Sequence, residues 1–479
     1  MNTHKNGNDL RAMSYEAKQL FSLTLQSGEL HANDILRLIP GRRLVVAGIW
    51  QGKTVVAKLF LDKRHAKRHA DAELAGIKLL QERNIPSPKF YGESQSEDGC
   101  VHALIFEWLE ADIDFARAWH QVSIRDALLP LLKALVIEVA TQHVFGLTQR
   151  DLHLNNFLFA NSSIWTLDAA QIESHGGRLP KKQSMDNLAL LFSQLGADSE
   201  NYQEILFKHY VNARGWAWKQ EDLRELYFMT DLWGKERWKN YERKIFRNST
   251  HFISKANWAS ESVCDREFYK NELMGFINNP EYVFSRTDVQ VLKKGRSSTV
   301  IRVSMDGHDY VIKRYNIKNW WHWMRRCLRT TRAKKCWRIA QKLRLFGIHT
   351  ARPVAYIENN IAGVRGKSYF VTEYVTGSNV NDYLQQNQAD NLKQNSMVTK
   401  VCSLLSSLKK MAITHGDLKM TNLLVSQESE PVLIDLDGAC EHRSVTILQR
   451  TSKKEWQRFL RNFDGAPSLR NKFTMGRVD

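Results

Sequence analysis

The stretch that decides the fold is HGDLKMTN at residues 415–422, in which Asp417 and Asn422 lie five positions apart. A second stretch of the same kind, QRDLHLNN, occupies residues 149–156 in the first half of the chain. The period between the two is far longer than that of a solenoid repeat. The pattern therefore predicts a duplicated domain and not a repeat array.

Each loop is followed by a short apolar segment that ends in an aspartate. In the first half this residue is Asp168, after Trp165-Thr166-Leu167, and in the second half it is Asp435, after Val432-Leu433-Ile434. Both segments are typical of β-strands. We expect each aspartate to lie near the carboxylate and amide of the preceding loop, which are Asp151 and Asn156 in the first half.

A lysine at the end of an apolar strand precedes each loop. Lys58 ends Val55-Val56-Ala57 and lies 93 positions before Asp151, and Lys313 ends Tyr310-Val311-Ile312 and lies 104 positions before Asp417. Each lysine alone is more often a surface residue whose stem packs on the protein. The same features recurring in the same order in both halves predict a shared site instead.

This set of side chains suits phosphoryl transfer. The reaction needs a cation on the nucleotide phosphates, oxygen ligands for Mg²⁺ and a carboxylate that orients the acceptor hydroxyl. We predict that Asp417 and Asp151 orient the acceptor. The predicted metal ligands are Asn422, Asp435, Asn156 and Asp168. The predicted nucleotide site comprises Lys313, Gly295, Glu373, Lys58, Glu73 and Glu107.

Both halves resemble the protein-kinase fold, with D-L-x-x-x-N loops and an aspartate after a short strand. The tandem arrangement and the HGDLKMTN loop resemble the lipopolysaccharide kinases, the family of the Kdo and core-heptose kinases. The resemblance covers roughly residues 40–200 and 285–465. It implies an α+β protein with two tandem protein-kinase-like bilobal domains.

The first domain would span residues 1–280, with an N-terminal helical segment and a helical extension over residues 216–279, and the second residues 281–479. The resemblance also implies an enzyme that uses ATP and Mg²⁺. Its acceptor would be a heptose or Kdo hydroxyl of the lipopolysaccharide inner core, or another anionic glycolipid. The reaction would take place at the cytoplasmic face of a Gram-negative inner membrane.

The chain departs from the kinase pattern at several positions. Neither half has a complete G-x-G-x-x-G loop: the second offers Gly295, and the first Gly48 and Gly52. Cys336 stands where the second half should carry a helix acid that pairs with Lys313. Either Glu373 or another acid replaces it, or the second half is not fully competent.

The loops themselves also differ from those of protein kinases. Gly416 replaces the arginine that anchors a phosphorylated activation loop. This change favours a small-molecule or glycolipid kinase over a regulated protein kinase. Gln149 stands where a histidine is usual, and Asp186 resembles the acid that braces the loop from a later helix.

The charge composition of the chain indicates what kind of partner it binds. The chain of 479 residues has 69 Lys and Arg against 51 Asp and Glu, a net charge of +18, which favours a polyanionic partner. No recognised nucleic-acid module accompanies this charge, so we expect no nucleic-acid partner.

Residues 1–8 do not resemble a signal peptide, and no run of about 18 uncharged apolar residues occurs. We expect a cytoplasmic protein, peripheral on the inner membrane.

A basic aromatic stretch at residues 319–338 suits an anionic membrane surface or the phosphates of lipid A. The alternative is that its tryptophans pack within the fold. Two other functions stay open: phosphorylation of a small metabolite, and a non-catalytic pseudokinase scaffold in envelope assembly. The residues also leave open which half is the enzyme.

Overall fold

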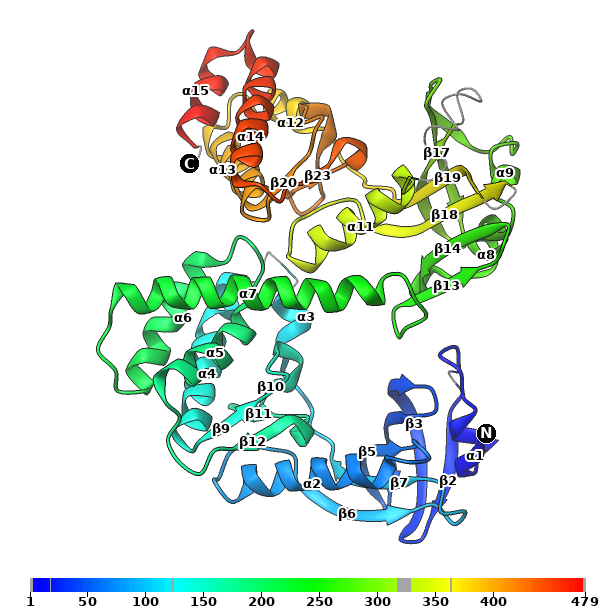
Figure 1. Cartoon of the computed structure of the whole chain (residues 1–479), viewed down its shortest axis with the longest axis vertical. Helices are drawn as coiled ribbons and strands as arrows, with labels where there is room; N and C mark the ends of the chain where they lie inside the picture. The colour runs from blue at the N-terminus through cyan, green and yellow to red at the C-terminus, as the bar shows by residue number, and fades with distance from the viewer. Residues whose placement is uncertain are drawn as a thin grey trace. The chain divides into compact units, whose positions relative to one another are not determined.

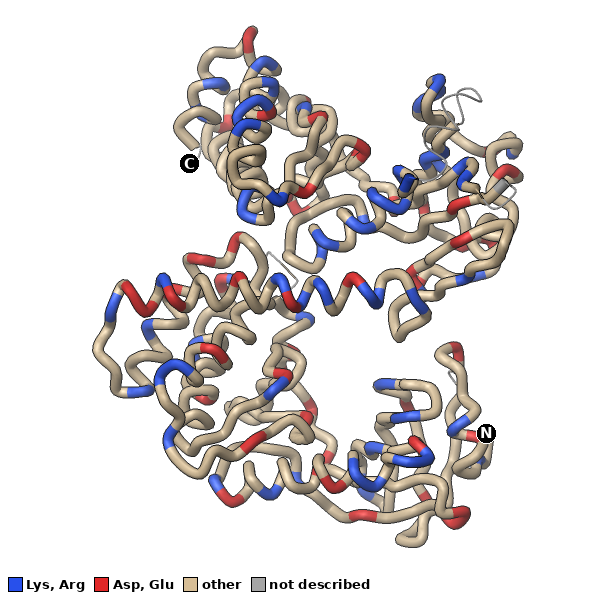
Figure 2. Tube along the Cα trace, viewed as in Figure 1, with Lys and Arg blue, Asp and Glu red and all other residues tan. Residues whose placement is uncertain are grey.

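The computed structural model describes residues 3–17, 19–119, 121, 125–316, 329–361 and 364–476 (Figure 1). The structure is a mixture of helices and strands, with 43% helix and 28% strand. The chain divides into two compact units. Unit 1 comprises residues 1–194 and 201–234, and unit 2 comprises residues 195–200 and 235–479. The division falls within helix α7 (Gln220–Lys244), along which acidic and basic residues alternate (Figure 2).

In the described part of unit 1, seven strands form a sheet in the order β1-β2-β3-β4-β5-β7-β6. These strands are β1 (Thr3–His4), β2 (Phe21–Leu25), β3 (Gly28–Ile39), β4 (Arg43–Trp50), β5 (Lys53–Phe60), β6 (Phe90–Gln95) and β7 (His102–Glu107). Antiparallel pairing places Lys58 of β5 opposite Val45 of β4 and Leu104 of β7. The two strands predicted over residues 42–60, joined by a tight turn, are confirmed.

The prediction of a helical N-terminal segment is wrong. Helix α1 (Gly7–Arg11) is short, and residues 21–39 form the β2–β3 hairpin. Leu23 and Leu25 are buried in the core of the sheet, while Ser22 and Thr24 alternate with them along β2. This period of two is that of a strand, and it outweighs the helical spacing read from the residues before it.

The rest of unit 1 is mainly helical. Helix α2 (Ala66–Gln81) follows β5, as the sequence predicted. The remaining elements are β8 (Ile113–Asp114), α3 (Phe115–Trp119), α4 (Arg125–Val144), β9 (Leu147–Gln149), β10 (Phe157–Ala160), β11 (Ser163–Thr166), β12 (Ile172–Ser174), α5 (Lys181–Phe192) and α6 (Glu200–Ala213). By length and composition α4 is apolar enough to cross a membrane. In the structure its Leu132, Leu135 and Val139 are buried, so this face of the helix packs inside the protein.

Unit 2 also contains a sheet, and its described residues give seven strands in the order β13-β14-β18-β19-β17-β16-β15. The strands are β13 (Phe252–Ala256), β14 (Ser260–Asp265), β15 (Gln290–Lys294), β16 (Ser298–Met305), β17 (His308–Tyr315), β18 (Pro353–Ile361) and β19 (Val364–Glu373). Residues 216–279 were predicted to be helical. This is right for α7 and for α8 (Asn271–Asn278) but wrong for β13 and β14. Phe252 and Val263 on these strands are buried in the same apolar core as Trp337 of α11, which favours a hairpin.

Helices form the rest of unit 2 together with short strand pairs. They are α9 (Pro280–Val283), α11 (Arg332–Leu345), α12 (Val380–Gln386), α13 (Asn391–Lys410), α14 (Val445–Leu460) and α15 (Pro467–Met475). The short strands are β20 (Ile413–Thr414), β21 (Leu423–Val425), β22 (Pro431–Leu433) and β23 (Cys440–Glu441). A shared apolar core links α11, α13 and α14 through residues such as Trp337, Val401 and Phe459.

The two units repeat one arrangement of elements. Strands β3, β4, β5, β7 and β6 of unit 1 and β15, β16, β17, β19 and β18 of unit 2 follow the same order in their sheets. In each unit the lysine singled out by the sequence lies on the third of these strands, and a helix, α2 or α11, connects that strand to the last one in this order, β6 or β18. The loop with the Asp and Asn five positions apart then follows a long helix, α4 or α13.

Candidate active site

The loop of unit 2 that carries Asp417 lies between β20 and β21 and is held by its own asparagine. The Nδ2 group of Asn422 donates to the backbone carbonyl of Asp417 at 2.8 Å. The side chain of Asp417 is 44% exposed, and the Nζ of Lys419 lies 2.8 Å from its Oδ2. The Asp417 carboxylate is thus accessible to a ligand and has a cation beside it.

Gly416 is required by the backbone of this loop. Its φ is +82°, and a Cβ atom there would lie 2.2 Å from the carbonyl oxygen of Gly438. An arginine of the protein-kinase type does not fit this conformation. A different residue fixes the loop instead: the carboxylate of Glu455 on α14 accepts hydrogen bonds from the backbone N–H groups of His415 and Gly416. The sequence interpretation missed Glu455.

Lys313 lies between two carboxylates. Its Nζ is 2.6 Å from Oδ1 of Asp435 and 2.7 Å from Oδ2 of Asp437. Burial works against the charged lysine, but Asp437 and Asp435 outweigh it and raise the pKa of Lys313. Burial likewise opposes ionisation of Asp435, yet the charge of Lys313 lowers the pKa of that carboxyl. Two anions around one cation leave this part of the site with a net negative charge.

Asp437 is the acid that replaces the missing helix glutamate. Cys336 of α11 lies next to it, with its Sγ 3.6 Å from Oδ1 of Asp437, and the hydroxyl of Tyr315 donates to the same oxygen. Glu373, the substitute named from the sequence, instead pairs with Arg352 at 3.8 Å. The available signal was the second acid in Asp435-Leu436-Asp437, because unit 1 has Ala170 at this position.

Lys313 and its two partner carboxylates, Asp435 and Asp437, line a cavity of about 600 Å³ in unit 2. Its polar lining includes Lys293, Lys313, Glu373, Asn422, Asp435 and Asp437. Its apolar lining includes Val300, Val311, Phe370, Leu424 and Ile434. Gly295 lies in the β15–β16 loop, where its N–H donates to the carbonyl of Ser298 at 3.0 Å. An apolar pocket of this size with a few convergent polar groups is typical of a cofactor or substrate site.

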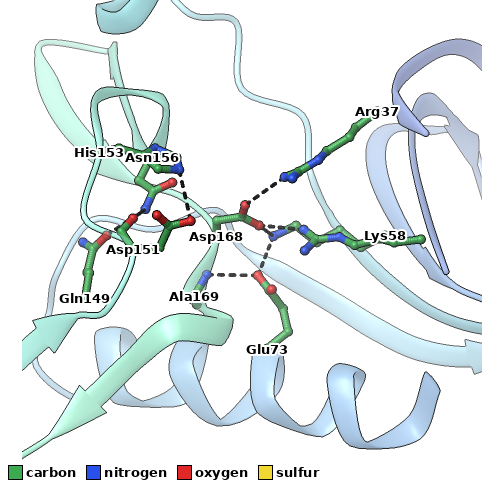
Figure 3. Close-up of polar contacts among 10 residues, drawn as sticks. Arg37, Lys58, Glu73, Gln149, Asp151, His153, Asn156, Asp168 and Ala169 are labelled. Carbon is green, nitrogen blue, oxygen red and sulfur yellow. Dashed lines mark hydrogen bonds and ion pairs between the residues drawn. The ribbon is translucent and has the colours of Figure 1, made fainter. Parts of the chain in front are cut away.

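In unit 1 the lysine pairs with a helix acid, as the sequence predicted. Lys58 contacts Oε1 of Glu73 on α2, and its Nζ lies 2.9 Å from Oδ1 of Asp168 (Figure 3). Glu73 is fully buried and also accepts the N–H of Ala169 at 3.1 Å. Gly76, one turn further along α2, allows this contact, because a Cβ there would lie 1.9 Å from the carbonyl oxygen of Ala169.

Asp168 is surrounded by cations that the sequence interpretation missed. Arg43 donates to Oδ1 of Asp168 at 2.7 Å, and Arg37 lies 3.7 Å from its Oδ2. Burial works against the charged form, but Lys58 and Arg43 outweigh it and hold the pKa of Asp168 well below its usual range. Asp168 is thus a carboxylate with three positive neighbours.

Residues 40–42 form the loop between β3 and β4 of unit 1. By strand order this loop corresponds to the β15–β16 loop of unit 2. Its Gly41 has a φ of +65°. Gly48 and Gly52, which the sequence offered for phosphate contacts, lie elsewhere. Gly48 packs against the carbonyl of His31, and Gly52 is in the β4–β5 turn at the far end of the hairpin. That prediction was wrong because the β3 strand had not been recognised.

The Asp151 loop of unit 1 is held by a network of amides. Asn156 is 3% exposed, and its Nδ2 donates to the carbonyl of Asp151 at 2.7 Å and to Oε1 of Gln149 at 3.1 Å. Asp151 itself is 72% exposed, with Nε2 of His153 3.5 Å from its Oδ2 (Figure 3). The usual histidine is therefore replaced by a glutamine that takes part in holding Asn156.

Two other predicted residues of unit 1 have different partners from those expected. The loop is braced by Asn187, whose Nδ2 donates to the carbonyl of Gln149 at 2.7 Å, while its neighbour Asp186 accepts from Trp233. The predicted role of Asp186 was therefore one position off. Glu107 ends β7, where its Oε2 accepts the N–H of Lys89 at 3.3 Å.

The basic aromatic stretch falls in two parts. Residues 319–328 lie outside the described residues. In the described part, Trp337 is fully buried, and its Nε1 donates to the carbonyl of Ile245 at 3.0 Å. Arg338 pairs with Glu242 and Glu441. Lys and Arg are frequent along α11 (Figure 2), but its Trp337 and Arg338 pack within the fold.

Comparison with known proteins gives one result for unit 2. No curated protein matches the chain. Residues 284–475 match the Lipopolysaccharide kinase (Kdo/WaaP) family. The matched segment contains Lys313, Asp417, Asn422 and Asp435, the residues on which the resemblance rested. The resemblance to the lipopolysaccharide kinases is thus confirmed for residues 284–475.

Proposed function

We propose that unit 2 is a kinase that transfers the γ-phosphoryl group of ATP to a sugar hydroxyl of the lipopolysaccharide inner core, a heptose or Kdo. One observation carries this proposal: Lys313, Asn422, Asp435 and Asp437 line a single cavity within the segment that matches the family. The acceptor follows from the family match. We place the reaction at the cytoplasmic face of the inner membrane, where ATP is present.

The residues of unit 2 suit Mg²⁺ at the phosphates. Asn422 and Asp435 supply amide and carboxylate oxygens, which are the ligands that this ion prefers. The two carboxylates around Lys313 also leave a net negative charge for a cation to balance. When bound, the ion would neutralise charge on the transferred phosphoryl group.

The protein's own groups then have separate tasks. Lys313 binds the phosphates of the nucleotide, and Asp437 and Asp435 keep its ammonium group in place. Asp417 accepts the proton of the acceptor hydroxyl while that oxygen bonds to the γ-phosphorus and the bond to the β-phosphate oxygen breaks. Lys419, beside Asp417, offsets the negative charge that gathers there.

We also propose that both units have the bilobal protein-kinase-like fold, as expected from the sequence. Support comes from the shared strand order and from the lysine and loop that recur at corresponding places. Because β13 and β14 belong to the sheet of unit 2, we place the start of the second domain before them and after the division within α7.

The experiment compares two matched variants, Asp417→Asn and Asp151→Asn. The purified chain is incubated with Mg²⁺, ATP and core oligosaccharide, and the product is weighed by mass spectrometry. We expect a gain of one phosphate with the wild type and with Asp151→Asn, and a loss of about 10³-fold in rate with Asp417→Asn. ATP binding should survive in both variants.

Transfer that persists in Asp417→Asn and stops in Asp151→Asn would move the active site to unit 1. A wild-type chain that binds ATP but phosphorylates a small sugar and not core oligosaccharide would contradict the proposed acceptor. A chain that neither binds ATP nor transfers phosphate would support the scaffold alternative.

A further inference from the structure

The two lysine sites differ in charge. In unit 2, Lys313 faces two carboxylates, Asp435 and Asp437. In unit 1 the residue at the position of Asp437 is Ala170, and the second carboxylate beside Lys58 is Glu73 of α2. The difference in charge comes from two arginines, because Arg43 and Arg37 join Lys58 within 3.7 Å of the oxygens of Asp168.

A divalent cation is disfavoured at this place in unit 1. Oδ1 of Asp168 already accepts hydrogen bonds from Lys58 and Arg43. Its Oδ2 faces Arg37 (Figure 3). Asn156, the other predicted ligand, is buried, whereas Asn422 of unit 2 is partly exposed and lines the cavity. A positive ion would therefore approach oxygens that three positive groups already occupy.

An anion is favoured for the same reason. The buried carboxylate of Glu73 pairs with Lys58. The cluster thus has three positive side chains, two arginines and a lysine, against the two carboxylates of Glu73 and Asp168. The Nε of Arg43 is buried without a hydrogen-bond partner. The side chain of Arg37 is 51% exposed and can reach a ligand. Guanidinium groups are the preferred partners of phosphate because their N–H groups match its oxygens in pairs.

The position of the cluster points to a chain of phosphates. Arg37 and Arg43 flank residues 40–42, the loop that corresponds to the β15–β16 loop of unit 2. In unit 2 the strand before that loop supplies Leu292 and Lys293 to the cavity. The basic cluster of unit 1 thus occupies the place at which its counterpart meets the cavity.

We propose that unit 1 binds a polyphosphate anion, the triphosphate tail of a nucleotide, through Arg37, Arg43 and Lys58 without a divalent cation. Asp168 acts there as the centre that holds the three cations in place, and not as a metal ligand. This departs from the sequence-based expectation of Mg²⁺ at Asn156 and Asp168. It does not depend on phosphoryl transfer by unit 2.

The test uses the full chain with Lys313→Met, which removes the phosphate clamp of unit 2. Binding of radiolabelled ATP is measured by equilibrium dialysis in EDTA. We expect one equivalent of ATP to bind to this chain. Arg43→Gln in the same background should weaken binding about tenfold or more, because a charge-assisted hydrogen bond is lost. Arg68→Gln, which removes an exposed arginine of α2, should leave it unchanged.

Two further arms keep the result decisive. If Arg43→Gln does not fold, as judged by circular dichroism, the exposed Arg37→Gln replaces it. Excess tripolyphosphate should displace ATP, since the tail carries the recognition. The proposal is overturned if EDTA abolishes ATP binding to the Lys313→Met chain, if the arginine variants bind as well as Arg68→Gln, or if tripolyphosphate does not compete. A failed transfer assay with a positive result here would reject the kinase activity alone.

Discussion

Lys313 and Asp437 form an ion pair, with 2.7 Å between Nζ and Oδ2, and this pair takes the place that Lys58 and Glu73 have in unit 1. The acid comes from the loop after β22 in one unit and from helix α2 in the other. The two units therefore hold corresponding lysines by different routes. Cys336, on the helix of unit 2 that corresponds to α2, lies beside Asp437.

Exchanging the two routes is a direct test of this relationship. Asp437→Ala should lower kcat/KM for phosphoryl transfer by about 10²-fold, because Lys313 loses one of the two groups that orient it. Adding Cys336→Glu should restore part of the lost activity. The Sγ of Cys336 lies 3.6 Å from Oδ1 of Asp437, so a glutamate at this position would place a carboxylate near the one removed. Asp464→Ala, an exposed acid of unit 2, is the control. If the double variant is no more active than Asp437→Ala, the acid does not act through Lys313.

Glu455 should be needed for both the stability and the activity of unit 2. Glu455→Ala leaves the N–H groups of His415 and Gly416 without their acceptor, at a cost of about 1–3 kcal/mol in free energy of unfolding. The misplaced loop should also reduce kcat. The matched variant Asn187→Ala removes the corresponding brace in unit 1 and should leave kcat unchanged. Urea unfolding and initial rates measure the two effects, and a normal kcat in Glu455→Ala would contradict the role assigned to this acid.

Gly416 should not tolerate even a methyl group. Gly416→Ala places a Cβ 2.2 Å from a backbone oxygen at a positive φ, so we expect a loss of more than about 2 kcal/mol in free energy of unfolding. In Gly465→Ala the new Cβ has no neighbour within 4 Å and φ is not positive, so stability should change little. Thermal unfolding compares the two, and equal melting temperatures would show that the loop can rearrange.

His143 should make unit 1 sensitive to acid. It is fully buried, and burial together with the charge of Arg214 lowers its pKa from 6.5 to about 4, while its bond to Asn187 works in the opposite direction. Below about pH 6.5 His143 binds a proton in the unfolded chain but stays neutral in the folded chain. The free energy of unfolding therefore falls as the pH drops towards 4. The loss from this group is about 3 kcal/mol at pH 4, at 1.36 kcal/mol per pKa unit.

The variant His143→Gln removes the titrating group. Its free energy of unfolding should be lower than that of the wild type at pH 7, but should fall less between pH 6.5 and pH 4. Denaturant titrations at both pH values, followed by tryptophan fluorescence, give the difference. Parallel pH profiles of the wild type and the variant would show that the pKa of His143 is the same in the folded and in the unfolded chain.

Local motifs led to part of the site. Lys58 and Glu73 were found because a lysine ending a strand and an acid on the next helix are a short-range pattern. Asp437 was missed although it lies two positions from Asp435. The partner of Lys313 was expected on the following helix, as in unit 1, and not in the loop that carries Asp435. Glu455 and Arg43 could not be found this way. They reach their partners across 39 and 125 positions of chain, and only the packed fold brings them together.

The fold shows the same limit. Strands with a strong apolar alternation and a tight turn, such as residues 42–60, were predicted correctly. The β2–β3 hairpin was not, because β3 is largely exposed over residues 33–37 and carries little apolar signal of its own. Its pairing with β4 comes from neighbours in the sheet. Missing that strand also misplaced the phosphate loop of unit 1.

Gly76 gives α2 a property that a designer can use. Because its Cα lies against the carbonyl of Ala169, helix and loop meet at backbone distance, and the Lys58–Glu73 pair depends on that closeness. A residue with a side chain at this position would act as a wedge that pushes Glu73 away from its lysine while leaving every charged group intact. One small residue thus offers a steric off-switch for unit 1, separate from its electrostatics.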